Sequence, residues 1–238
     1  VIDEALQKSE LSMDDIDGFA FTQEPGLIGS LHIGVQAAKT LSWYFNKPLI
    51  PVHHIIGHIY ANQFVEPLEF PLIALVVSGG HTELVWMKDE WSFEILGTTQ
   101  DDAIGEAYDK VARVVGLPYP GGPEIDKLAK DGKEHYKLPV PKTEKELDFS
   151  FSGLKSAVIQ LIDREKRNGN EINNADLVYC FQETALNILI SKTLKAVNEW
   201  KPKQLVLAGG VSANSRLRYL ISEKMKEYPE TKCIIPPL

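Results

Sequence analysis

The chain is poor in several features that would assign it to a class at once. Its 238 residues include only two cysteines, Cys180 and Cys233, which form neither a CxxC motif nor a paired framework. This usage favours a reducing compartment in which thiols stay free, so the sequence predicts a cytoplasmic location. The opening residues 1–6 lack the positive charge and long apolar run of a secretory signal. Every apolar run is far shorter than the ~20 residues that span a bilayer, and we expect no membrane association.

Positive charge is also scarce. The chain has 25 Lys and Arg residues against 33 Asp and Glu, which gives a formal net charge of -8. Because nucleic-acid phosphates are bound by clustered basic side chains, charge alone does not indicate a nucleic-acid partner. Basic clusters occur at residues 164–167 and 216–218, although such runs are more often solvated faces.

The spacing of apolar residues is typical of an α/β protein. Residues 30–44 and 53–64 repeat at helical spacing around a short apolar run at residues 48–52. From residue 70 the pattern changes to paired strands, so we predict two lobes, 1–69 and 70–238. In the second lobe we expect strands at 72–77, 82–87, 93–96 and 204–208, and helices at 102–115, 152–163, 181–200 and 214–226.

Prolines and glycines interrupt the second lobe. They predict a rigid loop at residues 118–123, because proline fixes φ and glycine permits unusual backbone angles. A polar stretch follows, and we expect an excursion from the core around residues 120–165. Ser152 is the expected N-cap of the helix after it.

Three of the chain's six histidines fall within six positions, at His53, His54 and His58. If this segment is helical, His54 and His58 lie one turn apart on the same face, and both imidazoles can reach one metal ion. The alternative is a polar pair at a helix start, satisfied by hydrogen bonds. Two imidazoles do not decide among zinc, iron, nickel and copper.

Two segments join a buried strand to a pair of glycines. Residues 76–80 (Val76, Val77, Ser78, Gly79 and Gly80) end a strand in a turn whose amide groups can approach an anion closely. The alternative is an ordinary hairpin turn. Residues 206–214 repeat the pattern and lead into a helix start, which also attracts anions. For Ser212 or Asn214 the alternative is simple helix capping.

Between these segments lie Asp109, the loop with Gly122, and Asp126. A carboxylate such as Asp109 can accept hydrogen bonds from ribose hydroxyls while glycines lie under a sugar or base. Its alternative is a surface ion pair with Lys110 or Arg113.

Taken together, these segments resemble the TsaD family, also known as Gcp. The matching motifs follow the family's order: HHxxxH at 53–58, VSGGHT within 76–82, GEAxDK at 105–110, YPGGP at 119–123, FSFSGLK at 149–155 and AGGVxAN at 208–214. The resemblance covers essentially the whole chain.

The resemblance implies a two-lobed α/β fold of the actin, hsp70 and sugar-kinase (ASKHA) type, with RNase H-like lobes of which the first is incomplete here. It implies transfer of a threonylcarbamoyl group from threonylcarbamoyl-AMP to N6 of adenosine 37 in tRNAs that read ANN codons. It assigns no catalytic side chain. By position, it makes His54 and His58 metal ligands, and it makes Val76, Val77, Ser78, Gly79, Gly80, Asp109, Gly122, Asp126 and Asn214 contacts of the adenylate or an ATP-like nucleotide.

The resemblance also implies a cofactor and partners. The cofactor is one divalent metal ion per subunit, iron or zinc, which would act as a Lewis acid on the carbamoyl group. The implied partners are tRNA, an inactive TsaB-like paralogue and a small TsaE-like ATPase, with a homodimer as the form of the chain alone.

The chain departs from the family pattern at three places. The family's ETSCDET-like opening segment is absent, and so is its Asp-Asn motif, whose aspartate would be a third metal ligand beyond Leu238. Glu24 stands where the family has glycine before Pro25. We therefore expect this span alone to bind metal weakly and to transfer nothing.

Three other functions are weaker alternatives. An ATPase or kinase of the same fold would use the glycine loops, but its Mg²⁺ prefers oxygen ligands to a histidine pair. A metalloprotease would need the HExxH arrangement, whereas Ile55 follows His54. An inert scaffold subunit would have no need to retain both histidines.

Overall fold

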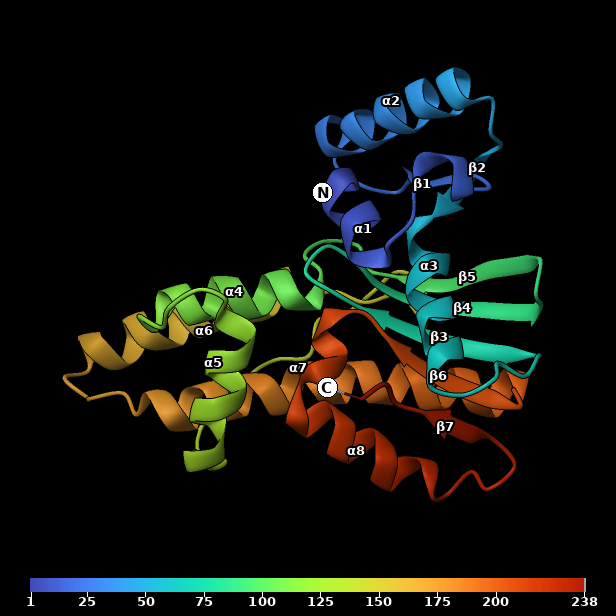
Figure 1. Ribbon diagram of the computed structural model, residues 1–238. Helices are drawn as coiled ribbons and strands as arrows, with labels where there is room; N and C mark the ends of the chain where they lie inside the picture. The colour runs from blue at the N-terminus through green and yellow to red at the C-terminus, as the bar shows by residue number, and fades with distance from the viewer. Residues whose placement is uncertain (238) are drawn as a thin grey trace. The chain divides into compact units, whose positions relative to one another are not determined.

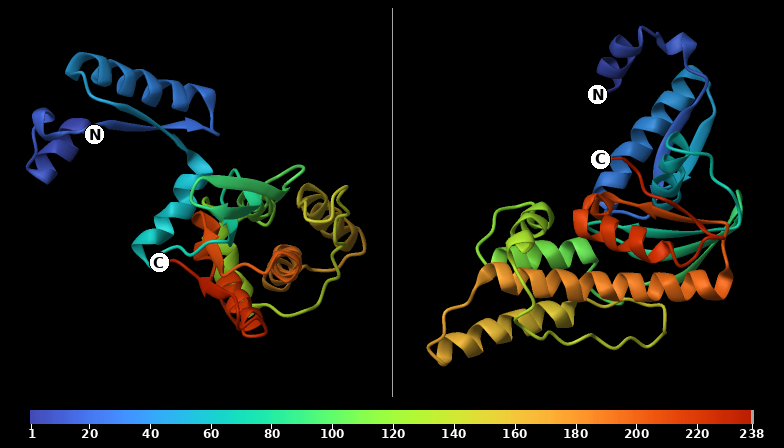
Figure 2. Two further views of the ribbon diagram at one scale, coloured as in Figure 1. Left: turned by 90° about the vertical axis from the view of Figure 1, so that its right-hand side faces the viewer. Right: turned by 90° about the horizontal axis from the view of Figure 1, so that it is seen from below.

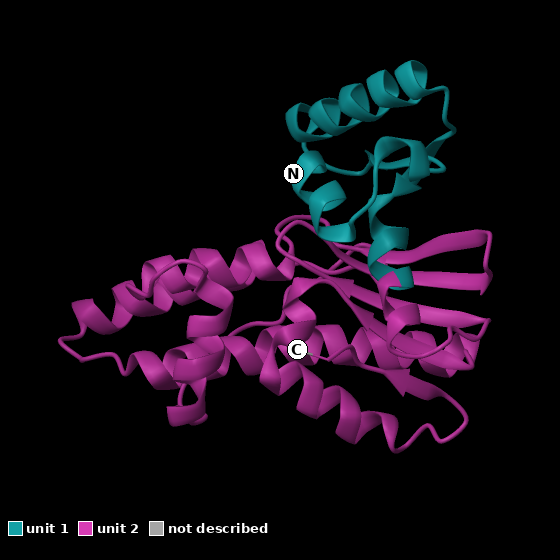
Figure 3. Ribbon diagram, in the orientation of Figure 1, with its two compact units in different colours: residues 1–60 teal, residues 61–238 magenta. Residues whose placement is uncertain are grey.

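The computed structural model describes residues 1–237, which fall into two compact units (Figure 3). The first unit is Val1–Tyr60 and the second begins at Ala61. Our assignment of residues 1–69 and 70–238 to two lobes stays a prediction. Within the described residues, no helix combines the length and apolarity that crossing a bilayer requires.

The first unit is built around one β-α-β crossover. Strands β1 (Phe19–Glu24) and β2 (Leu49–His53) pair in parallel, and α2 (Ile28–Phe45) connects them. Parallel neighbours require such a connection because a tight hairpin cannot join them. Helix α1 (Ile2–Ser9) precedes this crossover and α3 (His54–Tyr60) follows it. The helical period predicted α2 to within a few residues.

The second unit contains a five-stranded sheet in the order β5-β4-β3-β6-β7 (Figure 1). Its strands are β3 (Leu72–Val77), β4 (Thr82–Asp89), β5 (Ser92–Thr98), β6 (Gln204–Ala208) and β7 (Lys232–Ile234). Strand β3 pairs antiparallel with β4 and parallel with β6. All residues of β3 and β6 are buried, which explains the continuous apolar sequence of β3 and of the part of β6 that follows Gln204. The short strand β7 was not predicted.

Five helices pack with the sheet around one core. They are α4 (Ile104–Val114), α5 (Gly121–Leu128), α6 (Ser152–Arg167), α7 (Asn174–Trp200) and α8 (Ser215–Met225). Figure 2 shows α7, the longest of them, running along the sheet and on into the layer of α4, α5 and α6. Alternate residues of β3, such as Ile73 and Leu75, belong to the same buried core as aromatic side chains from the helices, such as Phe181.

Two helix boundaries differ from our predictions. The loop expected at residues 118–123 gives way at Gly121 to α5, where Pro123 is tolerated because the first turn of a helix needs no amide donors. Helix α7 begins at Asn174 rather than near Phe181. The side chain of Asn173 caps it by accepting from two amide groups, so the capping signal lies upstream of the apolar pattern.

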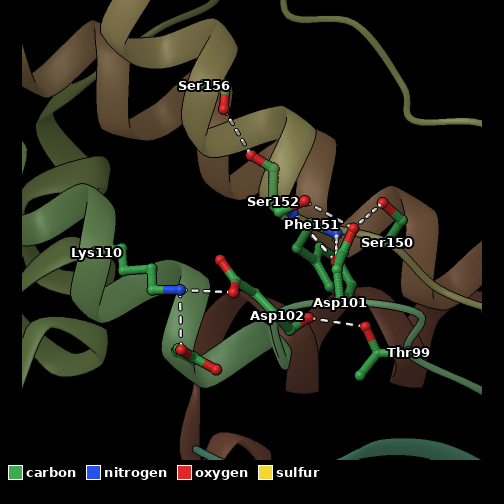
Figure 4. Close-up of polar contacts among 9 residues, drawn as sticks. Thr99, Asp101, Asp102, Lys110, Ser150, Phe151, Ser152 and Ser156 are labelled. Carbon is green, nitrogen blue, oxygen red and sulfur yellow. Dashed lines mark hydrogen bonds and ion pairs between the residues drawn. The ribbon is translucent and has the colours of Figure 1, made fainter.

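The start of α6 is also capped differently from our expectation (Figure 4). Ser152 is the first residue of the helix and donates through Oγ to Asp101 at 2.8 Å. Asp101 also accepts the amide groups of Phe151 and Ser152, so it takes the role that we assigned to Ser152. Burial raises the pKa of Asp101, but hydrogen bonds from Ser150, Phe151 and Ser152 outweigh burial and lower it overall.

Candidate functional site

The second unit contains a cavity of about 420 Å³, which is within the size range of small-molecule sites. Its lining comes from the turn after β3, from α4, from α5 and the loop before it, and from the segment between β6 and α8. The lining residues are Gly79, Gly105, Tyr108, Asp109, Pro120, Gly122, Pro123, Asp126, Lys127, Lys130, Gly210, Val211, Ala213 and Asn214.

Most of the residues predicted to contact an adenylate lie at this cavity. Gly79, Asp109, Gly122, Asp126 and Asn214 line it. The remaining candidates are in or beside the turn that leads to Gly79: Val76 and Val77 are fully buried in β3, and Ser78 and Gly80 flank Gly79.

The glycines around the cavity are of two kinds. A Cβ on Gly105 would lie 2.7 Å from the Ser78 carbonyl oxygen, and a Cβ on Gly209 would lie 2.3 Å from that of Val77. Backbone therefore packs against backbone at both places, and Gly209 also has a φ of +88°. By contrast, apart from adjacent residues and the local helix backbone, no described atom lies within 4 Å of a Cβ built on Gly122 or Gly210. Packing does not require glycine at these two positions, and the missing side chains leave room for a ligand.

Hydrogen bonds fix the start of α4 against the turn after β3. Thr82 Oγ1 accepts the Ile104 amide at 2.9 Å, and the Ser78 carbonyl accepts the Gly105 amide at 3.2 Å. The turn is closed internally, because Ser78 Oγ accepts the His81 amide at 2.9 Å. The glycine turn and a helix N-terminus therefore meet at one edge of the cavity, an arrangement that favours anions.

Asp109 connects α4 to α5. Its Oδ1 accepts the amide of Gly121 at 2.7 Å, and the side chain faces the cavity. The ion pair of Asp109 with Lys110 that we considered is wrong, because Lys110 bonds instead to Asp102 at 2.6 Å and Glu106 at 2.9 Å (Figure 4). These two bonds raise the pKa of Lys110.

Asp126 and Asn214 both hold the start of α8. Asp126 accepts the amide and the hydroxyl of Ser215, at 3.0 and 3.1 Å. Asn214 is the N-cap of α8, since its Oδ1 accepts the Leu217 amide at 2.8 Å. The capping interpretation of Asn214 is confirmed, but the same side chain also lines the cavity, so capping and ligand contact are compatible.

Several lining residues were not among the predicted contacts, and Tyr108, Lys127 and Lys130 are the largest of them. Lys130 lies one turn after Asp126, so helical spacing from that aspartate could have placed it on the same face. Tyr108 precedes Asp109 and is almost fully buried, which an apolar pattern predicts as core.

The histidine pair lies in the first unit, on α3. His54 Nε2 and His58 Nε2 are 3.2 Å apart, which confirms that they share one face of a helix. Metal–nitrogen bonds of about 2.0–2.1 Å at angles of about 90–110° separate two ligand nitrogens by roughly 2.9–3.4 Å, so the pair fits one metal ion. Burial, and then the charge of His54, lower the pKa of His58 and favour its neutral, metal-binding form.

The pair alone is an incomplete metal site. Within residues 1–237, no group of three or more His, Cys, Asp and Glu side chains is arranged to hold a metal ion. Two imidazoles supply half of a tetrahedral ligand set.

The chain matches a family model described as "TsaD: tRNA N6-adenosine threonylcarbamoyltransferase" over residues 1–238. It is 55% identical over 240 residues to the protein of that name from Listeria monocytogenes serotype 4b (strain CLIP80459). It is 53% identical over 241 residues to the one from Bacillus subtilis (strain 168). The whole chain is covered in both comparisons, and it spans 70% and 69% of the two relatives.

Two solved structures show the same fold at low sequence identity. Full-length HypF in its phosphate- and nucleotide-bound form has a TM-score of 0.71 and 16% identity, covering 98% of this chain and 46% of HypF. The activator of the 2-hydroxyisocaproyl-CoA dehydratase from Clostridium difficile with bound ADPNP has a TM-score of 0.55 and 13% identity, covering 100% of this chain and 74% of the activator. These likenesses support the ASKHA-type α/β fold.

Proposed function

Because the chain belongs to the TsaD family of tRNA N6-adenosine threonylcarbamoyltransferases, we propose that the cavity of its second unit binds the adenylate of threonylcarbamoyl-AMP. The protein is a transferase that forms threonylcarbamoyladenosine in tRNA. The observation that carries the proposal is the convergence of Gly79, Asp109, Gly122, Asp126 and Asn214, from distant parts of the sequence, on one cavity.

The cavity offers each part of an adenylate a matching partner. The turn at Gly79 and the N-terminus of α4 are held together at one edge of the cavity, where the positive end of the helix dipole favours the phosphate. Asp109 and Asp126 present carboxylate oxygens to ribose hydroxyls. Gly122 leaves space for a flat ring. HypF and the dehydratase activator, which share the fold, were both solved with nucleotides.

In the proposed reaction, N6 of adenosine 37 in tRNAs that read ANN codons attacks the carbamoyl carbon. A bond forms between N6 and that carbon, the bond from the carbon to the phosphate oxygen breaks, N6 loses a proton, and AMP leaves. The residues of the cavity hold AMP throughout, so their role is to orient the carbamoyl group for attack.

We further propose that His54 and His58 ligate one divalent metal ion per subunit, iron or zinc. When bound, such an ion supplies Lewis-acid polarisation of a carbonyl oxygen. What supports this assignment is the 3.2 Å separation of the two Nε2 atoms on α3.

The proposed partners follow from the family and from charge. An inactive TsaB-like paralogue and a small TsaE-like ATPase would act with this protein in the cytoplasm, and a homodimer would form in their absence. Because the chain carries a net charge of -8, a partner would add positive surface for the tRNA phosphates.

Depletion of the protein in its host tests the function. We expect threonylcarbamoyladenosine, measured by mass spectrometry in bulk tRNA, to fall in step with the protein, and to recover when the protein is expressed again. Another modified nucleoside of the same tRNAs serves as the control. An unchanged level would refute the transferase function and favour the ATPase or scaffold alternatives.

A further inference from the structure

Gln182 lies on α7, with only 3% of its surface exposed, and bonds to two residues that line the cavity. Its Oε1 accepts a hydrogen bond from Asn214 Nδ2 at 3.0 Å and another from the Tyr108 hydroxyl at 3.4 Å. Both donors line the cavity, whereas Gln182 itself is not among its lining residues. A buried side-chain amide therefore joins α4, α7 and the start of α8 at one point.

The two donor groups determine that the oxygen of the Gln182 amide, and not its nitrogen, faces them. Asn214 Oδ1 already accepts the Leu217 amide, so its Nδ2 is the atom that faces Gln182. Reversing the amide of Gln182 would place one NH₂ group against another, which offers no acceptor. Burial, and then the charges of Asp126 and Glu183, raise the pKa of Tyr108, so its hydroxyl keeps the proton that it donates.

Asn214 is consequently held at both ends of its amide. Leu217 fixes the oxygen and Gln182 fixes the nitrogen. An amide nitrogen carries two hydrogens, so the second hydrogen of Nδ2 is left to donate to a ligand in the cavity. Without an acceptor at position 182 the nitrogen end would lose its buried partner, and the amide could rotate away.

We propose that Gln182 is a positioning residue, which orients the amide of Asn214 for contact with the adenylate. This inference rests on the proposed function, because it requires that Asn214 contacts the nucleotide. Tyr108 supports the arrangement by donating to the same oxygen, and its ring packs edge-on against Phe181 with centroids 5.1 Å apart.

The test is AMP binding to the full-length protein, measured by isothermal titration calorimetry. Gln182→Met keeps a side chain of similar length but removes the acceptor. We expect the dissociation constant for AMP to rise on the order of tenfold, as for the loss of one well-placed hydrogen bond. Gln182→Glu keeps an acceptor oxygen and is expected to recover most of the affinity.

A buried glutamine elsewhere in the unit supplies a matched control. Gln204 on β6 is 1% exposed, accepts the Glu69 amide at 2.8 Å and donates to the Pro67 carbonyl at 3.1 Å. Gln204→Met removes a comparable pair of bonds away from the cavity. It is expected to lower the unfolding temperature while leaving AMP affinity within about twofold of the parent protein.

A double-mutant cycle separates this inference from the proposed function. Asn214→Ala alone should weaken AMP binding, and adding Gln182→Met to it should cause no further loss, because the two residues act as a unit. If Asn214→Ala has no effect, the proposed contact of Asn214 fails and this inference fails with it. If Asn214→Ala weakens binding but Gln182→Met does not, or if their effects add in full, the positioning role alone is refuted.

Discussion

Replacing both His54 and His58 with alanine is expected to strip the bound metal from the full-length protein and to reduce threonylcarbamoyladenosine in its host by about a hundredfold or more. The reason is geometric, since the two Nε2 atoms are 3.2 Å apart and can share one ion. Removing even the residues that support metal ligands costs roughly 10–100-fold in affinity or activity, and removing ligands should cost at least as much. Metal content by mass spectrometry and nucleoside analysis of tRNA are the two measurements.

His32 provides the control for this pair. It is an exposed histidine of the same unit, on α2, and His32→Ala should leave metal content and tRNA modification unchanged. The competing interpretation is a hydrogen-bonded histidine pair without a metal. Under that interpretation the double variant would lose stability but keep the metal content of the parent protein, and the proposed metal site would be wrong.

Gly122→Leu is expected to block nucleotide binding without unfolding the protein. Gly122 is the second residue of α5 and lines the cavity. Apart from adjacent residues and the local helix backbone, no described atom lies within 4 Å of a Cβ built there. Leucine is a good helix former, so the helix itself should tolerate it. The side chain would occupy the space of the ligand, and an overlap that costs about 1–3 kcal/mol corresponds to roughly 5–150-fold weaker AMP binding.

Gly153→Leu is the matched control, because Gly153 is the second residue of α6. A Cβ there meets only Pro141 Cγ at 3.8 Å, an ordinary contact among the described atoms. Both variants should unfold at temperatures within a few degrees of the parent protein, by differential scanning calorimetry. Equal AMP affinity of the Gly122→Leu variant and the parent would mean that the ligand does not lie over this glycine.

The sequence predicted the regular elements well where the apolar pattern was long. Strand β3 and helix α2 were placed to within a few residues, because burial on one or both faces determines their apolar spacing. At α5 and α6 the errors occur where a distant residue determines the local structure. Asp101 caps α6 from a separate segment, and Asp109 accepts an amide at the start of α5. Neither contact has a signature within the helix that it starts.

The candidate site could be predicted from motifs but not from composition. The glycine pairs after β3 and β6 contribute Gly79 and Gly210 to the cavity, and the histidine spacing predicted the shared helix face of His54 and His58. The family resemblance selected Asp109, Asp126 and Asn214 among many polar residues. The role of Gln182 could not be foreseen, because its partners are distant in the sequence and a buried glutamine follows no periodic rule. Such contacts are defined only by the packing of α7 against its neighbours.

A crystal structure of the full-length protein with AMP tests the central claim most directly. The account predicts the nucleotide in the cavity of the second unit, with its ribose at Asp109 and Asp126, its phosphate at the turn of Gly79, and Asn214 Nδ2 within hydrogen-bond distance. Well-ordered AMP bound at any other place, with this cavity holding only water, would contradict it.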